Sequence, residues 1–219
     1  MHTCYALTPH HRLHTRSGHP ESRQRLDAVG SMLEESGLAA ELDRIEARPA
    51  TFDQLELVHF DTYLEQLRTI SDQGGGELDP DTYATGSSWE VLREAAGAAL
   101  AVTDAVCSGQ AENGFALTRP PGHHAKPGSA MGFCLVNHAA VAAAHARQRH
   151  GLDRVMIVDF DVHHGNGTQE IFYQDAEVLY GSVHQSPLFP GTGSADEIGV
   201  GPGEWRTVNV PVPERTGDE

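Results

Sequence analysis

Basic residues, cysteines and long apolar runs are all scarce in this chain of 219 residues. Its 15 lysines and arginines are outnumbered by 31 acidic residues, which gives a formal charge of −16 with histidine neutral. Because binding to a phosphate backbone needs a basic surface, we expect no direct contact with nucleic acid. The acidic balance is compatible with cationic ligands such as lysine-bearing peptides or polyamines, although it also favours solubility.

The cysteines Cys4, Cys107 and Cys134 are far apart and form no CxxC pair. Neither a disulfide framework nor a structural zinc knuckle is therefore expected. The chain has no apolar run of about 18 residues, which excludes a membrane-spanning helix. Its first residues contain no apolar segment of signal-peptide length. We expect a cytoplasmic protein with reduced thiols.

Helical and extended patterns alternate along the chain. Apolar spacing predicts helices at 21–37, 88–107 and 137–150, and shorter amphipathic stretches within 52–70. Asn137 is a natural N-cap for the third helix, and Gly151 a natural stop. Glycines and turn-forming residues predict a loop at 74–86.

Short apolar runs predict strands at 114–118, 154–161, 177–183 and 206–212. The run at 154–161 is unbroken, as in strands that are buried on both faces. Alternation of strands and helices predicts an α/β fold in which helices cover both faces of a parallel sheet. With no repeat or linker, residues 1–219 are predicted to form a single domain.

Polar clusters follow the ends of three predicted strands, where ligands bind in open α/β sheets. The first is RPPGHHA at 119–125, in which prolines stiffen the loop that carries His123 and His124. Paired imidazoles on a rigid loop suit general acid–base catalysis, because the groups must be held near the reacting atoms.

The second cluster is DFDVHHGNGT at 159–168. Alternation along a strand puts Asp159, Asp161 and His163 on the same side. Asp161 and His163 are a ready pair of metal ligands, and Asp159 is placed to accept a hydrogen bond from an imidazole.

The third cluster is HQSPLFPGTG at 184–193, in which Phe189 offers an apolar wall for an alkyl chain. Phe133, in MGFC at 131–134, is a matching aromatic residue. Taken singly, each cluster has a plain structural explanation as surface histidines, a strand end or core phenylalanines. Together, at successive strand ends, they favour a metal-dependent hydrolytic site. The remaining histidines are assigned to loops or helix surfaces without a role, and they include His10, His11, His14, His19, His145 and His150.

These motifs resemble those of the histone deacetylase family, especially its bacterial class II-like members and the acetylpolyamine amidohydrolases. The resemblance covers nearly the whole chain, in the family's order: HPESRQRL at 19–26, LDPDTY at 78–83, RPPGHHA, GFCLVNHAAVA, VDFDVHHGNGTQEIFY and FPGTG. The combination of RPPGHHA with DxDxHHGNGTQ is highly specific. The resemblance implies a three-layer arginase-like fold and zinc-dependent removal of acetyl groups from acetyl-lysine side chains or acetylated polyamines.

The resemblance also implies roles for individual residues. Asp161 and His163 match two of three zinc ligands. His123 and His124 match the tandem histidines that handle protons while zinc polarises the amide carbonyl and activates water, with Asp159 orienting His123. Two positions depart from the pattern: Asn166 stands where some members have an aspartate paired to the second histidine, and His138 replaces an Asn or Asp.

Substrate-binding residues and a second cation are implied in the same way. Gly132, Phe133 and Phe189 would line a tunnel for the acyl-lysine or acyl-amine chain. Asp79, with Asp81 as the alternative, would be an acidic rim residue that binds the substrate backbone. Ser182 and the backbone of 159–163 match a structural site for a monovalent cation, expected to be K⁺.

The family's third zinc ligand and its oxyanion-stabilising residue have no match in these residues. We therefore expect a domain that is incomplete at its C-terminal end, and a chain that alone binds zinc weakly and turns over little substrate. Two alternatives stay open: a di-manganese ureohydrolase resembling arginase, and a non-catalytic pseudo-deacetylase that binds acylated ligands. The sequence decides neither the acyl substrate nor the oligomeric state.

Overall fold

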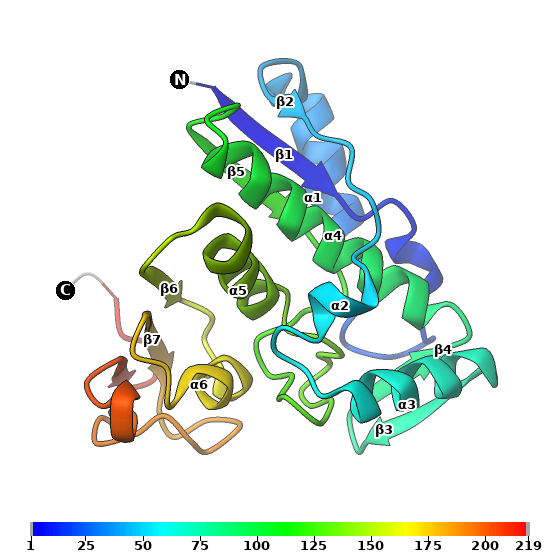
Figure 1. Cartoon of the computed structure of the whole chain (residues 1–219). Coiled ribbons are helices and arrows are strands. Elements are labelled where there is room, and N and C mark those ends of the chain that lie inside the picture. The colour runs from blue at the N-terminus through cyan, green and yellow to red at the C-terminus, as the bar shows by residue number, and fades with distance from the viewer. Residues whose placement is uncertain (1, 218–219) are drawn as a thin grey trace.

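The computed structural model describes residues 2–217 (Figure 1). Its strands are β1 (Thr3–Leu7), β2 (Asp43–Arg44), β3 (Gly75–Asp79), β4 (Thr82–Thr85), β5 (Asn113–Leu117), β6 (Val155–Asp159), β7 (Val178–Gln185) and β8 (Thr207–Val212). Its α-helices are α1 (Gln24–Glu35), α2 (Phe52–Leu55), α3 (Asp61–Asp72), α4 (Ser88–Cys107), α5 (His138–His150) and α6 (Asn166–Phe172). The three long helices and four strands predicted from the sequence are confirmed. None of these helices is long and apolar enough to cross a membrane.

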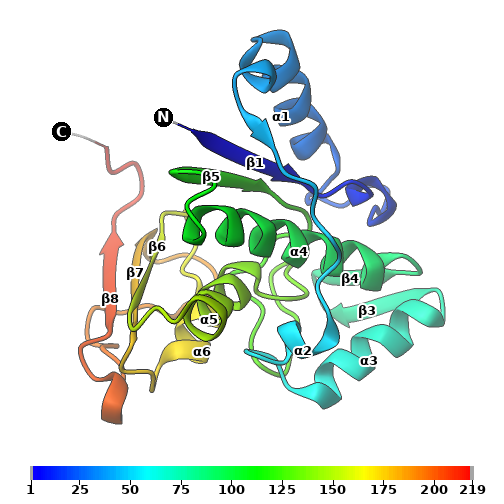
Figure 2. The same ribbon diagram turned by 45° about the horizontal axis from the view of Figure 1, so that its top comes forward.

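The parallel strands form two sheets, in the orders β2-β1-β5 and β6-β7-β8. Every pair within them is parallel. In Figure 2, β1 and β5 lie along α4, whereas β6 lies by α5, and the two helices pack against each other. Ligand sites are expected beyond the carboxyl ends of β5, β6 and β7, which the loops after these strands occupy.

The first sheet is covered on both faces. Alternate residues of a strand point to opposite sides. In β1, Cys4 and Ala6 join a core cluster with residues of α4, while Tyr5 and Leu7 pack with Leu26 of α1. The period of two in β1 therefore places one helix on each side of the sheet.

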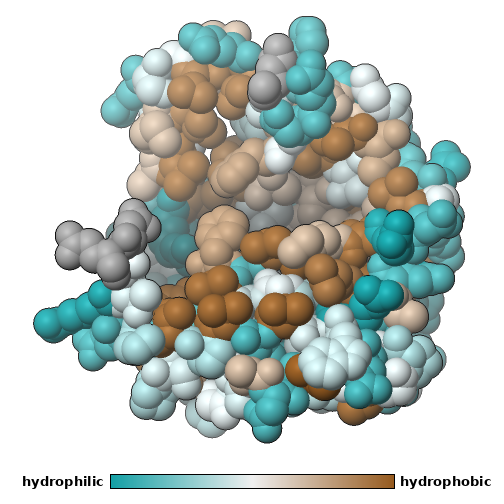
Figure 3. All heavy atoms as spheres, turned by 90° about the vertical axis from the view of Figure 1, so that its left-hand side faces the viewer, coloured by the Kyte–Doolittle hydropathy of each residue, from teal (hydrophilic) through white to brown (hydrophobic). Residues whose placement is uncertain are grey.

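The prediction that the apolar run of β6 is buried on both faces is wrong. Val155 and Ile157 pack with α5 residues in the largest core cluster. Met156 and Val158 point the other way and are 60% and 57% exposed. Figure 3 shows apolar residues gathered around a hollow on this side of the molecule. Within residues 2–217, helices cover one face of this strand, although its sequence is apolar on both.

The loop predicted at 74–86 is instead a two-stranded antiparallel hairpin of β3 and β4. Tyr83 and Ala84 of β4 are buried, and both strands pack against α3, so tertiary contacts override the turn-forming composition. The hairpin also supports the MGFC segment, because the backbone N–H of Phe133 donates to Oγ1 of Thr82 at 2.9 Å.

Helix α5 has the predicted ends. The side chain of Asn137 accepts a hydrogen bond from the backbone N–H of Ala140 at 3.0 Å. Gly151 ends the helix in the left-handed conformation, with φ of 67°. The helix is thereby held at a defined start, next to the loop that carries His123 and His124.

Candidate active site and metal ligands

Arg119 begins the tandem-histidine loop, defined here as residues 119–137, and is held by a buried ion pair. Its guanidinium donates to both carboxylate oxygens of Glu21, at 2.6 and 2.9 Å, and to the carbonyl oxygen of His11. The side chains of Arg119 and Glu21 are 3% and 2% exposed. This ion pair thus holds together the HPE and RPPGHHA motifs, which are about a hundred residues apart in sequence.

Two buried histidines hold other parts of this loop. His138 Nε2 lies 2.9 Å from the carbonyl oxygen of Pro120, and His59 Nδ1 lies 2.9 Å from that of Lys126. His59 Nε2 accepts the backbone N–H of Asn137 at 2.9 Å, which leaves its proton on Nδ1. Burial lowers the pKa of both histidines to about 4. His138, unexplained in the sequence, is a neutral side chain that anchors the loop.

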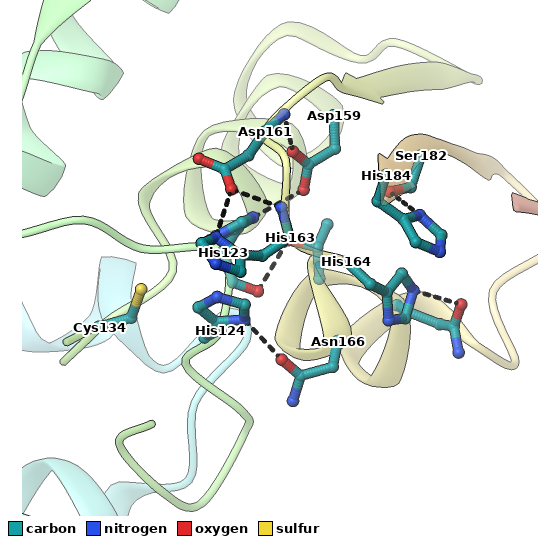
Figure 4. A network of polar contacts seen from close by, with 12 residues as sticks. His123, His124, Cys134, Asp159, Asp161, His163, His164, Asn166, Ser182 and His184 are labelled. Atoms are coloured by element: carbon teal, nitrogen blue, oxygen red, sulfur yellow. Dashed lines mark hydrogen bonds and ion pairs between the residues drawn. The ribbon is translucent and has the colours of Figure 1, made fainter. Parts of the chain in front are cut away.

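His123 and His124 lie side by side, with ring centroids 4.0 Å apart (Figure 4). His123 Nδ1 lies 3.0 Å from Oδ2 of Asp159, and His124 Nδ1 lies 2.8 Å from Oδ1 of Asn166. Because these oxygens accept hydrogen bonds, each Nδ1 carries a proton and each neutral ring keeps a lone pair on Nε2. The arrangement suits proton uptake at Nε2.

His123 and His124 differ in their burial and in the charge of their hydrogen-bond partners. Burial, followed by the charge of His123, lowers the pKa of His124 to about 4. Burial acts to raise the pKa of Asp159, but the hydrogen bond and charge of His123 outweigh it and place this pKa below its usual value. Tyr180 also donates to Asp159, at 3.2 Å. At neutral pH, His124 is therefore neutral beside an amide, whereas His123 faces an ionised carboxylate.

Asp161 and His163 lie in the loop that follows β6. His163 Nδ1 is 3.0 Å from Oδ1 of Asp161, and the His163 backbone N–H donates to the same oxygen at 2.8 Å. His123 Nε2 lies 3.9 Å from this oxygen. The side chains of Asp161 and His163 are 48% and 39% exposed. An accessible carboxylate and imidazole this close fit two ligands of a zinc ion.

Glycine at positions 132 and 165 lets the side chains of the site lie close together. A Cβ at Gly132, where φ is 54°, would lie 2.5 Å from the ring of His124 and 3.0 Å from that of Phe189. A Cβ at Gly165 would lie 2.1 Å from Oδ2 of Asp159. Any larger side chain would push apart the groups that hold the tandem histidines.

Phe189 and Phe133 have different neighbours. The ring centroid of Phe189 lies 5.0 Å from that of His124 and 6.1 Å from that of His163. Phe133 has a positive φ of 69° and packs edge-on against His19, with centroids 4.9 Å apart. Phe189 and Gly132 therefore lie directly against His124.

Asp79 lies at the end of β3, in the hairpin that supports Phe133. Its Oδ1 accepts the backbone N–H of Asp81 at 2.9 Å. Burial acts to raise the pKa of Asp79, but hydrogen bonds from Asp81 and Thr82 outweigh it and lower the pKa. Burial, with Asp79 nearby, raises the pKa of Asp81. Of the two, Asp79 is the better-stabilised anion.

Ser182 is buried on β7, in register with Asp159 of β6. Its Oγ lies 2.9 Å from Nδ1 of His184. The neighbouring His164, which is 1% exposed, was not predicted from the sequence. His164 joins Thr192 Oγ1 at 2.7 Å to Gln169 Oε1 at 3.0 Å, and so ties the FPGTG loop to α6. The two adjacent histidines at 163–164 are the sequence feature that could have indicated a role for His164.

The assignment of the remaining histidines to loops or helix surfaces is wrong for His11, His14 and His145, which are 6%, 1% and 6% exposed. His145 lies with His150 and Asp104, and within residues 2–217 this is the one group of three metal-ligating side chains whose atoms gather within 4.8 Å. His145 and His150 are five residues apart on α5, a spacing that does not put them on one helix face, so the group depends on Asp104 of α4 and has no clear sequence signal.

Comparisons with known proteins agree with the motifs. Residues 19–219 match the histone deacetylase domain. The histone deacetylase-like amidohydrolase of Pseudomonas aeruginosa is 45% identical over 197 residues, which cover 90% of this chain and 52% of that protein. A probable deacetylase of Methanothermobacter thermautotrophicus is also 45% identical, over 89% of this chain and 58% of that one. The chain thus spans about half the length of these curated relatives.

The fold agrees as well. The crystal structure of the HDA15 HD domain matches with a TM-score of 0.91 and 42% sequence identity, over 96% of this chain and 61% of that one. The predicted arginase/deacetylase-like α/β architecture is confirmed. Since the motifs, the fold and a domain match over 19–219 all agree, the chain belongs to the histone deacetylase family.

Proposed function

We propose that the protein is a zinc-dependent deacetylase, which removes acetyl groups from acetyl-lysine side chains or acetylated polyamines. One observation carries the proposal: two hydrogen-bonded imidazoles, His123 with Asp159 and His124 with Asn166, stand beside Asp161 and His163. The names of the relatives, deacetylase and amidohydrolase, support hydrolysis of an acyl amide.

Asp161 and His163 would supply two ligands of the zinc ion. When bound, zinc polarises the amide carbonyl and activates water for attack. His123, whose Nδ1 is hydrogen-bonded to a carboxylate and whose Nε2 faces Asp161, takes the proton of the attacking water. The tandem pair then returns a proton to the leaving amine. With two ligands among these residues, the 219-residue chain alone is proposed to bind zinc weakly and turn over little substrate.

The walls of the site suit a slender aliphatic chain. Phe189 lies against the rings of His124 and His163, and Gly132 keeps the wall free of a side chain. Phe133 would extend this wall, and Asp79 would accept hydrogen bonds from substrate amides at the rim. A net charge of −16 would attract the cationic substrates that carry such chains.

A structural K⁺ ion is also proposed, held by Ser182 and the backbone of 159–163. The support is their adjacency: Ser182 pairs in register with Asp159, directly before that segment. A cytoplasmic location is proposed as well. Cys4 and Cys134 are buried free thiols, as expected in a reducing compartment.

Acetate release from an acetyl-lysine peptide and from an acetylated polyamine tests the function. We would compare the 219-residue chain with the product of the complete coding sequence, each with added zinc. Turnover of either substrate by the complete product is expected. Robust turnover by the 219-residue chain would contradict the incomplete-site proposal, and no turnover of either substrate would point to a non-catalytic acyl-binding protein.

A further inference from the structure

Asp104, His145 and His150 gather where the last turns of α4 and α5 meet. The Nε2 atoms of both histidines converge on Oδ1 of Asp104, at 2.8 and 2.6 Å. The two rings are 5.9 Å apart and inclined by 75°, so their nitrogens approach the oxygen from different directions. These contacts bring two imidazole nitrogens and a carboxylate oxygen, all potential metal ligands, within 4.8 Å of one another.

The surroundings favour a cation at this point. α4 ends at Cys107 and α5 at His150, and the C-terminal end of a helix carries partial negative charge. Of the two arginines in the last turn of α5, Arg147 and Arg149, Arg147 is directed toward Asp175 at 2.8 Å and toward Glu177. The last turns of the two helices and the Asp104 carboxylate therefore meet at the two imidazoles.

We propose that Asp104, His145 and His150 form a second metal site, for a divalent transition ion such as Zn²⁺, Co²⁺ or Ni²⁺. Imidazole nitrogens favour these ions over Ca²⁺ and Mg²⁺, which prefer oxygen ligands. Ligands about 2 Å from such an ion lie roughly 3.3 Å from one another. The three ligand atoms already lie within 4.8 Å of one another, so small side-chain rotations complete the site.

The site is open to solvent on one side. The Asp104 side chain is 50% exposed and that of His150 is 20% exposed, so the ion enters from solvent and water completes its coordination. His145, at 8% exposure, is the buried ligand that fixes the position. The ion would staple α4 to the end of α5, the helix whose first residue, His138, anchors the tandem-histidine loop. Its role is structural, and it does not depend on the proposed deacetylase activity.

The test is Co²⁺ binding by the 219-residue chain without a histidine tag. Titration would be followed by visible absorption and by metal content after gel filtration. The starting protein is the Asp161→Asn/His163→Gln variant, which lacks the other predicted ligands. Asp104→Asn and His150→Gln are then added singly, since both side chains are partly exposed and their replacement leaves the core unchanged. His10→Ala is the matched control, because His10 pairs with Glu94 at 2.6 Å without a second imidazole.

The starting variant is expected to bind one Co²⁺ per chain. Asp104→Asn and His150→Gln should each weaken this binding about tenfold or more, as loss of a ligand does, while His10→Ala leaves it unchanged. The proposal is overturned if the starting variant binds no Co²⁺, or if it binds Co²⁺ equally well with Asp104→Asn and His150→Gln. Far-UV circular dichroism of each variant confirms that it is folded.

Discussion

At the scale of single residues, the tandem histidines differ in their hydrogen-bond partners. Asp159 gives His123 a carboxylate as its partner, whereas Asn166 gives His124 a neutral amide. His124 is also the more buried of the two, which lowers its pKa to about 4. The two imidazoles therefore have unlike partners, one an ionised carboxylate and one a neutral amide.

Replacing Asp159 by Asn tests this division. An amide can offer an N–H to His123 Nδ1 and reverse its tautomer, so kcat should fall roughly a hundredfold to ten-thousandfold. The steady-state deacylation rate of the protein translated from the complete coding sequence, with zinc added, measures this change in kcat. Tyr180→Phe is the control, because it removes a different hydrogen bond to Asp159, of 3.2 Å, and should cost about tenfold at most. An Asp159→Asn variant no slower than Tyr180→Phe would contradict the assignment.

Gly132→Ala tests the close wall of the site. Its Cβ would meet the rings of His124 and Phe189, so activity should be lost along with some stability. Gly37→Ala is matched to it, because Gly37 has a φ of 77° but open space around it, and it should lose only about 1 kcal/mol of stability. Urea unfolding and deacylation rates measure both. Equal effects would show that backbone strain, and not the clash, matters.

The residues that sequence reasoning placed well are those whose role follows from local order. Asp159, Asp161 and His163 are close in sequence at the end of β6, so their proximity follows from chain order, although Asp161 and His163 lie in the loop beyond the strand. The burial of His14, His138 and His145 could not be predicted, because it depends on contacts with Ser88, Pro120 and Asp104 far along the chain.

At the scale of elements, the tandem-histidine loop has no regular structure of its own and depends on its anchors. Glu21 accepts two hydrogen bonds from Arg119, the first residue of the loop, in a buried site. His138, at the start of α5, holds Pro120. With His59, whose Nδ1 lies 2.9 Å from the Lys126 carbonyl oxygen, three anchors from separate parts of the chain hold the loop.

Removing one partner of the buried Glu21–Arg119 ion pair should lower the free energy of unfolding. Glu21→Gln leaves the Arg119 charge without its counter-ion, which is expected to cost about 3–5 kcal/mol of unfolding free energy. The double variant Glu21→Met/Arg119→Met should be more stable than Glu21→Gln, since no unpaired charge stays buried. Urea denaturation gives all the values. A loss below about 1 kcal/mol for Glu21→Gln would contradict this account of the loop.

The elements that the sequence predicted correctly carry strong local signals, such as Asn137 and Gly151 at the ends of α5. The β3–β4 hairpin was missed because its glycines and Asp79 suggest a loop when taken alone. Its formation depends on packing against α3, which no local pattern of residues reveals.

At the scale of the whole molecule, burial of histidines links stability to pH. Burial lowers the pKa of His14 to about 3, and that of His59 and His138 to about 4. In the unfolded chain these groups titrate near pH 6.5, so between about pH 6.5 and 4 the unfolded state binds more protons. The free energy of unfolding should therefore fall as the pH falls through this window.

Each buried histidine should contribute up to about 1.4 kcal/mol per pH unit. Urea unfolding between pH 7.5 and 4.5 measures the slope. His138→Gln keeps a donor for the Pro120 carbonyl but removes one titrating group, so its slope should be shallower. Unchanged stability across the window would contradict the assignment of neutral buried histidines.

At this scale the α/β architecture could be predicted from the sequence, but which faces of the sheet are covered by helices could not. The apolar run of β6 has the sequence of a strand buried on both faces, yet Met156 and Val158 are exposed among the residues described. Hydrophobicity reveals that a surface favours burial, and says nothing of which segment covers it.

The central claim is that hydrolysis occurs at Asp161 and His163. Its most direct test is acetate release by the complete coding product after chelation and again after zinc is restored, in the wild type, Asp161→Asn and Asp104→Asn. We expect zinc to restore the activity of the wild type and of Asp104→Asn, while Asp161→Asn stays about a hundredfold slower or more. Full activity after chelation, or an Asp161→Asn variant as active as the wild type, would contradict it.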